Sequence, residues 1–382
     1  MATIYGANTL STGYDVANSL RFNGGSSDDL VRTPSSSGNN NKSTISVWVK
    51  RSRVDEEDFI IYGFGGSANR CKITFLDNNK LQINTIVSSS NNLVYETNRL
   101  FRDVSAWYHI VIAFDSTLGT AGDRVRLYIN GIEETSFATE THMGQNTSNF
   151  LSTSGTPVYI GSQASGNYFD GYMAEFVFID GQQLDPTSFG EFDSNSPNIW
   201  KPKDVSGLTF GTNGFYLDFE NASSLGADVS GNSNNFTVNN LTSVDQSTDT
   251  CTNNFMTLSP LLKGSNIDLT EGNVVSTGNT SSDAGNVACT FPIAFSGKWY
   301  FEVKITAISA AGYPKIAVFH DFESVSQGNY NGGSGGNNMH PTESIATVLQ
   351  YNSTTLGNPN SNLTITAPAN GNIFQFALDM DN

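Results

Sequence analysis

Carboxylates are the side chains best able to do chemistry in this 382-residue sequence, which has 36 aspartates and glutamates. A glycosidase needs two carboxyl groups about 5–5.5 Å apart for retention, or about 6.5–9.5 Å apart for inversion. The densest acidic run, VDEED at residues 54–58, holds consecutive rather than alternating carboxylates, so we interpret it as a solvated turn. Glu175 has no carboxylate two residues away on either side. We therefore expect no catalytic residue and no enzymatic activity.

Two other motifs match catalytic patterns only in form. Residues 332–336 (GGSGG) fit GxSxG, but a nucleophile elbow needs a buried strand before it and a helix after it, and these residues lie in a stretch rich in glycine and asparagine. Residues 63–65 (GFG) precede a predicted strand, whereas a dinucleotide fingerprint precedes a helix. The four histidines have no ligand spacing, and His109, within an apolar run, is predicted to be a core residue.

Calcium is the cofactor for which the sequence offers ligands. Asp228, Ser230, Asn232 and Asn234 place oxygen-bearing side chains at alternate positions, as in oxygen-rich calcium loops. A terminal bidentate glutamate is missing, so a Ca²⁺ site and an ordinary polar turn both stay open. The three cysteines are widely spaced and form no CxxC motif, so we expect free thiols rather than a disulfide framework or a zinc site.

Charge and hydropathy exclude two classes of partner. The formal net charge is −17, and all nine arginines lie at or before Arg126. An acidic surface repels phosphate backbones, so we expect no nucleic-acid partner. The apolar runs of seven or eight residues are far shorter than the ~20 needed to cross a bilayer, so we expect no membrane insertion. The first residues lack a basic region followed by an apolar one, and we expect no signal peptide.

The elements that would position these residues are predicted to be short strands. Between Trp107 and Asp185 four strand-like runs are separated by turn residues, and Val125, Leu127 and Ile129 alternate with polar neighbours. Asn130-Gly131 is the dipeptide typical of a type I′ hairpin turn. The run WYHIVIAF is apolar at nearly every position, which indicates a central strand covered on both faces. Eight or more strands by residue 185 predict a sandwich of two antiparallel sheets.

Residues 18–195 resemble a laminin-G-like domain of the concanavalin A-like lectin/glucanase group. The resemblance rests on LRFNGGSSDDLVRTPSS, ISVWVKRS, WYHIVIAFDST, RLYINGIEE and FDGYMAEFVFIDGQQLDP. It implies a jelly-roll β-sandwich that binds glycans or proteins, and it implies Asp170 as a second calcium candidate. Tyr168 and Tyr172 are then candidates for stacking on sugars, with ordinary packing as the alternative. The Glu-x-Asp-x-Glu pattern of the glucanase branch is missing.

Two further segments follow. Residues 196–253 resemble the connector that follows such a domain in tail and fibre proteins of marine bacteriophages, and we expect a linker there. Residues 254–382 resemble a SPRY domain through GKWYFEV, where Trp299, Phe301, Val303 and Ile305 share one face, and through NIFQFALDMDN. The SPRY pattern would continue beyond Asn382, so we expect either a fragment or an edge completed by another chain. Residues 320–341 are expected to form a long surface loop.

The predicted fold is all-β: tandem antiparallel sandwiches, laminin-G-like over 1–195 and SPRY-like, incomplete at its C-terminus, over 254–382. The resemblances imply a non-enzymatic bacteriophage virion protein, a fibre or appendage subunit that attaches to host surface glycan or protein. Its other partners would be further virion proteins and copies of itself, with a trimer as one candidate state. The virion exterior is the implied location. A structural decoration protein of the capsid or tail is the alternative, and a polysaccharide-degrading enzyme is a third.

Overall fold

The computed structural model describes most of the chain up to residue 278 and shorter stretches after it. The described residues are 13–164, 166–278, 287–291, 293, 296–307, 315–318, 347–350, 355–358, 361–364, 369–379 and 381. The sequence motif at 332–336, His320, His340 and the expected loop at 320–341 therefore lie outside them. The described part contains strands and four short 3₁₀ helices but no α-helix, which confirms the all-β prediction for those residues.

The chain divides into two compact units. The first, here called the N-terminal unit, comprises Tyr5–Thr257 together with Thr270–Val274. The C-terminal unit comprises mainly Leu258–Leu269 and Val275–Asn382. None of the described residues forms a helix long and apolar enough to cross a membrane.

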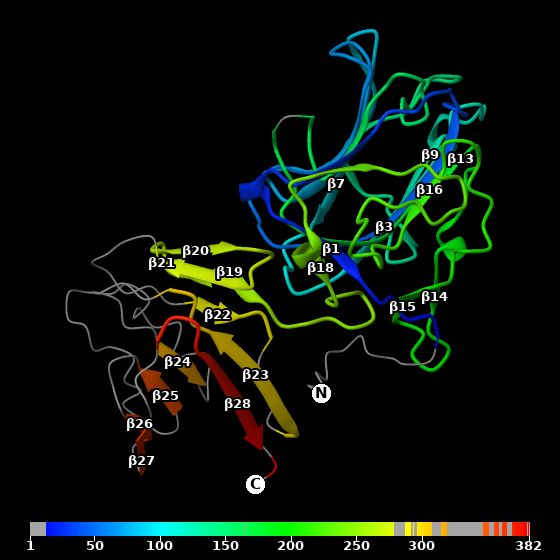
Figure 1. Ribbon diagram of the computed structural model, residues 1–382. Helices are drawn as coiled ribbons and strands as arrows, with labels where there is room; N and C mark the ends of the chain where they lie inside the picture. Colours follow the sequence, from blue (N-terminus) through cyan, green and yellow to red (C-terminus); the bar gives the residue numbers. More distant parts are fainter. Residues whose placement is uncertain are drawn as a thin grey trace. The chain divides into compact units, whose positions relative to one another are not determined.

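The N-terminal unit contains two eight-stranded antiparallel sheets, here called sheets A and B (Figure 1). The order in sheet A is β10 (Ile132–Glu133), β9 (Val125–Ile129), β8 (Tyr108–Asp115), β3 (Lys42–Arg51), β13 (Gly171–Asp180), β1 (Ser19–Phe22) and β18 (Gln246–Ser247), with β16 (Phe215–Leu217) also paired to β13. The order in sheet B is β11 (Phe137–Thr141), β7 (Ser90–Leu100), β6 (Lys80–Val87), β5 (Arg70–Phe75), β4 (Asp58–Phe64), β12 (Val158–Ile160), β2 (Asp29–Arg32) and β17 (Thr237–Asn239). A small separate sheet pairs β14 (Gly190–Phe192) with β15 (Trp200–Pro202).

Local sequence explains the main strands and turns. β8 is buried along nearly its whole length because both of its faces are covered, as its largely apolar sequence predicts. β13 is buried along its whole length as well, although it includes Glu175. Asn130 and Gly131 have φ values of 50° and 78°, so the β9–β10 hairpin has the two positive φ angles that the dipeptide predicts. The four 3₁₀ helices are η1 (Gly24–Ser26), η2 (Ala121–Asp123), η3 (Pro186–Ser188) and η4 (Ser243–Asp245).

One large core fills the N-terminal unit, with side chains from both sheets. Phe22, Phe75, Phe114 and Phe176 are each fully buried within it. Two smaller clusters lie elsewhere in the unit. One gathers Trp48, Trp107, Tyr172 and Trp200, and the other is built around Val111, Val177, Phe210 and Tyr216. The clusters join strand residues to segments after residue 195, so those segments pack on the sandwich.

The segment 196–253, expected to be a linker, is part of the sandwich. β16 pairs with β13, β17 with β2 and β18 with β1, so the segment extends both sheets. Figure 1 shows β16 running beside β13. Leu217, Phe219, Leu225 and Phe236 from this segment lie in the large core. The correction has a physical cause. The alternation of Phe215, Leu217 and Phe219 indicates a strand but not its partner β13, and β17 and β18, with three and two residues, are too short to show a period-2 pattern.

The C-terminal unit contains several small antiparallel sheets. They pair β19 (Leu258–Lys263) with β22 (Val287–Cys289), β20 (Ile267–Thr270) with β21 (Val275–Gly278), β23 (Lys298–Lys304) with β28 (Ile373–Asp379), and β24 (Lys315–Val318), β25 (Thr347–Gln350), β26 (Thr355–Asn358) and β27 (Ser361–Thr364) in that order. The two motifs that suggested SPRY pair with each other along seven residues (Figure 1), and the rings of Phe301 and Phe376 stack with centroids 4.6 Å apart.

Candidate functional site

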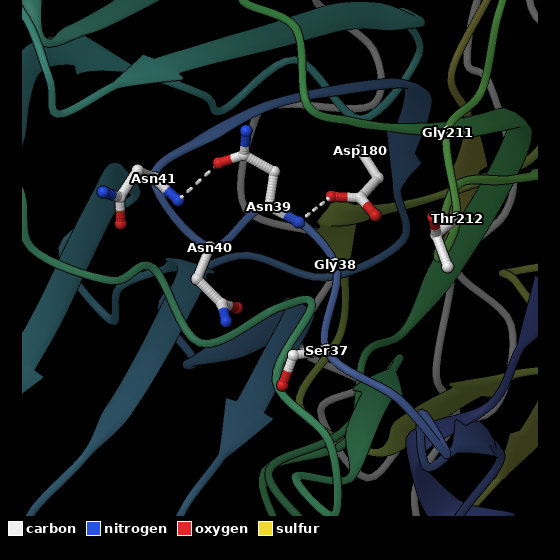
Figure 2. Close-up of a pocket in the computed structure, with 8 residues that line it drawn as sticks. All are labelled: Ser37, Gly38, Asn39, Asn40, Asn41, Asp180, Gly211 and Thr212. Carbon is white, nitrogen blue, oxygen red and sulfur yellow. Dashed lines mark hydrogen bonds between the residues drawn. The ribbon is translucent and has the colours of Figure 1, made fainter.

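A polar pocket of about 630 Å³ opens among loops of the N-terminal unit where β13 ends. We call it the loop pocket. It is lined by Ser37, Gly38, Asn39, Asn40, Asn41, Asp180, Gly211 and Thr212 (Figure 2). Residues 37–41 come from the loop between β2 and β3, and Gly211 and Thr212 come from the segment that leads into β16. The lining thus combines two parts of the sequence that are about 170 residues apart, held by the end of β13.

Asp180 fixes the frame of the loop pocket. Its Oδ1 accepts the backbone N–H of Asn39 at 2.7 Å, and its Oδ2 accepts the backbone N–H of Asn213 at 2.9 Å. The side chain of Asn39 in turn accepts the N–H groups of Asn41 and Lys42, which closes a turn of the loop (Figure 2). Hydrogen bonds to an ionised acceptor are among the stronger ones in proteins. The buried carboxylate therefore ties both walls of the pocket to the sheet.

A third loop braces the same walls. The carbonyl of Asn40 accepts the N–H of Asn149, and the carbonyl of Ser152 accepts the N–H of Gly38. Asn213 donates its side-chain amide to the carbonyls of Ser36 and Ser152. The pocket is consequently a set of loops with satisfied backbone groups, which holds its side chains in fixed positions.

Two glycines allow both walls of the loop pocket to lie close to Asp180. A Cβ atom on Gly38 would overlap the Asp180 carboxylate, and one on Gly211 would overlap the Asp180 carbonyl. Gly211 also has a φ of 76°, a region that favours glycine.

Several polar groups of the loop pocket are left for a ligand. Within the described part of the chain, no protein group bonds to the side-chain nitrogens of Asn39 and Asn40, to the side-chain amide of Asn41, or to the hydroxyl of Thr212. Amides and hydroxyls can donate and accept, which matches the hydroxyl groups of a sugar. No aromatic ring lines the pocket, so recognition here would depend on hydrogen bonds rather than stacking.

The residues proposed for calcium instead form the frame of a turn. Asp228 accepts three backbone N–H groups, from Tyr216, Ser230 and Asn234, at 2.7–2.9 Å. The hydroxyl oxygen of Ser230 accepts the N–H of Asn232. The side chains of Asn232 and Asn234 direct their nitrogens at the carbonyls of residues 211, 212 and 214. N–H donors thus occupy the oxygens of Asp228 and Ser230, and Arg32 donates to the side-chain oxygen of Asn234, so in this structure the four side chains hold a turn together.

Asp170 lies away from that turn. It immediately precedes β13, whereas Asp180 ends it, so about 30 Å of strand separates the two carboxylates. Burial raises the pKa of Asp170 to about 6, an effect that Arg53 opposes. Among the described residues, no group of three or more His, Cys, Asp or Glu side chains could hold a metal ion. Neither Asp170 nor Asp228 therefore belongs to such a group.

The two tyrosine candidates differ in exposure. Tyr172 is 2% exposed and packs near Trp107 with ring centroids 6.3 Å apart, so it is not available to stack on a sugar. Of the two sequence interpretations of Tyr172, the structure bears out ordinary packing, because β13 is covered on its outer face as well as its inner face. Tyr168 is half-buried and its carbonyl accepts a hydrogen bond from Arg53.

Glu175 is the carboxylate whose surroundings most resemble those of a catalytic acid. It lies at a bulge in β13 with a φ of 50°, and its Oε2 accepts the hydroxyls of Tyr216 at 2.8 Å and Tyr14 at 3.2 Å. Burial raises its pKa to about 7, and the two hydroxyls oppose that rise. The side chain is only 5% exposed and lines neither pocket described here. Its position indicates a structural role.

His109 is a core residue, as its apolar run predicts. It is fully buried and stacks on Trp48 with ring centroids 4.6 Å apart. Trp200 donates its indole N–H to Nδ1, and Nε2 lies 2.8 Å from the hydroxyl of Ser46. Since Nδ1 must accept, the proton resides on Nε2 and is donated to Ser46. Burial lowers the pKa of His109 to about 3, so the ring is neutral.

The sequence prediction missed every residue of the loop pocket. In the sequence, the run SSSGNNN at residues 35–41 indicates only a polar connection between two strands. Three consecutive asparagines in a loop were the available signal, but their partner Asp180 lies 141 residues after Asn39. Spacing along the chain cannot reveal such a pairing.

Comparison with known families supports a lectin-like domain in this unit. Residues 23–184 match the family model of the Concanavalin A-like lectin/glucanases superfamily. This match supports the laminin-G-like prediction for that part of the chain. No curated protein matches the chain.

Solved structures that match part of the chain include proteins of several kinds. A heptameric SAP-like pentraxin from Limulus polyphemus is 15% identical, with 45% of this chain and 80% of that chain covered and a TM-score of 0.33. A putative carbohydrate binding protein from Bacteroides ovatus is 15% identical, with 59% of each chain covered and a TM-score of 0.39. Domain 4 of a GH43 extracellular arabinanase from Geobacillus stearothermophilus, in complex with arabinotriose, is 18% identical, with 41% and 69% covered and a TM-score of 0.31.

Proposed function

We propose that the N-terminal unit is a non-enzymatic module that binds a surface glycan in the loop pocket. The observation that carries this proposal is a set of polar groups on braced loops that have no bonding partner among the described residues: the side-chain nitrogens of Asn39 and Asn40, the side-chain amide of Asn41 and the hydroxyl of Thr212. The match to a lectin-like family over residues 23–184 favours the same class of ligand.

The chemistry of the pocket implies modest affinity for a single module. Each net hydrogen bond to a neutral group is worth about 0.5–1.5 kcal/mol, and the pocket has no aromatic platform. Several copies of the module on one particle would raise the overall affinity for a glycan-bearing surface through avidity. The proposal therefore includes a homo-oligomer, with a trimer as the first state to test by sedimentation.

We further propose that the chain is an exposed virion protein of a bacteriophage, a fibre or appendage subunit. This part rests on the sequence resemblance to marine phage fibre proteins and on the SPRY-like motifs GKWYFEV and NIFQFALDMDN. An antibody raised against the purified chain should label the outside of intact particles in electron micrographs. Labelling confined to lysed cell debris would contradict the virion assignment.

A glycan array with the purified, full chain tests the binding module. The substitutions Asn41→Ala and Thr212→Ala remove groups that make no side-chain bond within the described part, so the fold should be retained. Each should weaken binding about 2- to 10-fold. Matched controls are Asn198→Ala and Thr120→Ala, exposed positions outside the pocket, which should bind as the parent does.

Three other outcomes would contradict the proposal. Pocket variants that bind no more weakly than their matched controls would show that the loop pocket is not the site. A multimer that binds no glycan, together with particle density in which the module is clamped between neighbours, would favour a structural decoration protein. Release of new reducing ends from polysaccharide would instead identify an enzyme.

A further inference from the structure

A second polar pocket, of about 460 Å³, lies between the end of β2 with the loop that follows it and the segment around β17. We call it the arginine pocket. The residues used below are Arg32 at the end of β2, Thr33 and Ser35 after it, and Ser233, Asn235 and Thr237 near β17. Arg32 is the one charged side chain among the described residues that line it.

Arg32 is oriented without being neutralised. Its Nη2 donates to the side-chain oxygens of Asn213, at 3.1 Å, and Asn234. No carboxylate oxygen of the described residues lies within 4.0 Å of its nitrogens, and its Nε and Nη1 have no hydrogen-bond partner among those residues. Arg21, Arg51 and Arg53, by contrast, each form an ion pair with a carboxylate.

The nearest carboxylates are engaged elsewhere. Asp180 and Asp228 lie close enough to favour the charge of Arg32, and burial of the guanidinium opposes it. Both oxygens of each carboxylate accept backbone N–H groups, five in all. Those amide dipoles offset the negative charge, so a cationic group with free donors faces the pocket in a chain whose net charge is −17.

The two pockets share a wall. Asn213 accepts from Arg32 on one side and donates its backbone N–H to Asp180 on the other. Asn234, in the arginine pocket, donates its side-chain amide to the carbonyl of Thr212, in the loop pocket. A chain of sugars could therefore occupy both pockets at once.

We propose that the arginine pocket binds the acidic group, a carboxylate or a sulfate, of the polysaccharide whose hydroxyl groups occupy the loop pocket. This inference rests on the proposed function and specifies its ligand as an acidic polysaccharide. Arg32 supplies the charge through Nε and Nη1, and the hydroxyls of Thr33, Ser35 and Ser233 can donate to the remaining oxygens of the anion.

The test measures binding of the full chain to polygalacturonate, dextran sulfate and neutral dextran by calorimetry. Arg32→Gln should weaken binding of an acidic polymer about tenfold at 50 mM salt and leave neutral polymer unchanged. The charge-matched control is Arg102→Gln, at an exposed residue outside both pockets, which should change binding less than twofold. The response to the uronate and to the sulfate polymer separates the two acidic groups.

A second variant tests the same point without removing the bonds of Arg32. Asn235→Asp keeps an oxygen that can accept the N–H of Asp228 but adds a negative charge at the pocket mouth. It should also weaken acidic-polymer binding about tenfold, whereas Asn198→Asp, outside the pocket, should not.

The outcomes separate the two proposals. Equal losses in Arg32→Gln and Arg102→Gln, or acidic-polymer binding that neither pocket variant changes, would overturn the arginine-pocket inference. Binding of neutral glycan that depends on Asn41, with no preference for acidic polymers, would overturn this inference but leave the glycan-binding proposal standing. No binding of any polymer would overturn both.

Discussion

Glu175 makes the stability of the N-terminal unit depend on pH in a way that can be calculated. The carboxyl group is buried, accepts hydroxyl groups from Tyr14 and Tyr216, and has a pKa raised from 4.5 to about 7. Burial is the main cause, and the nearby Asp218 and Glu220 add to it. The folded unit therefore prefers the protonated, neutral form.

The sign follows from linkage. A carboxyl group with a raised pKa stabilises the fold fully below pH 4.5, and that stability is lost as the pH rises through about 7. At about 1.4 kcal/mol for each pH unit between the two values, ionising Glu175 costs the folded state about 3 kcal/mol. Replacing it with glutamine keeps an oxygen that accepts the tyrosine hydroxyls and removes the charge.

Urea unfolding of the parent and of Glu175→Gln at pH 5, 6, 7 and 8, followed by tryptophan fluorescence, measures this cost. The difference in unfolding free energy between variant and parent should increase by about 2–3 kcal/mol from pH 5 to pH 8. Asp28 and Asp170, whose pKa values burial also raises to about 6, titrate in both proteins and cancel in the difference. A difference that stays constant across this range would refute the reasoning.

Three further predictions concern the frame of the fold. Gly38→Ala should lower the unfolding free energy by roughly 1–3 kcal/mol and abolish binding in the loop pocket, because the new Cβ atom would overlap the Asp180 carboxylate. The control Gly207→Ala, where a Cβ atom meets no other atom within 4 Å, should change neither the stability nor the binding. Lys50→Met should destabilise the unit by about 3–5 kcal/mol in urea, because it leaves Asp249 buried without its partner at 2.7 Å; adding Asp249→Asn should restore part of that loss. EDTA should not lower the melting temperature, since N–H donors occupy the oxygens of Asp228 and Ser230, and a clear drop would reveal a bound cation.

The sequence alone predicts those strands and turns whose pattern is visible in adjacent residues. The alternation of Val125, Leu127 and Ile129 and the Asn130-Gly131 turn depend on adjacent residues, and the structure confirms both. The GKWYFEV and NIFQFALDMDN strands were also predicted, although their pairing with each other joins residues more than 70 positions apart. Each run is long enough to show the period-2 alternation of a strand. Each strand can therefore be predicted without knowing which strand it pairs with.

When strands are short, the sequence does not show which distant strands they pair with. β16 and β17 have three residues each, and their partners β13 and β2 lie far back in the chain. In the same way Asp180 and Asn39 form a pocket wall only because β13 ends beside the loop that follows β2. Polar residues in loops carry no periodicity, so the two pockets become visible only once the sheets are assembled.

The boundary of the lectin-like fold therefore matters for its function. A sandwich that ended at residue 195 would lack β16, β17 and β18 and would expose the core residues that meet Phe215, Leu217 and Phe236. It would also leave Lys50, which is 1% exposed, without the carboxylate of Asp249.

Both pockets would disappear with that segment. Gly211 and Thr212 form one wall of the loop pocket, and Ser233, Asn234 and Asn235 form one wall of the arginine pocket. The strands before residue 195 supply only the opposite walls. The segment that resembles a connector in sequence thus completes the sheets and contributes two of the eight lining residues of the loop pocket and four of the eight of the arginine pocket, so folding and the proposed ligand binding depend on the same segment.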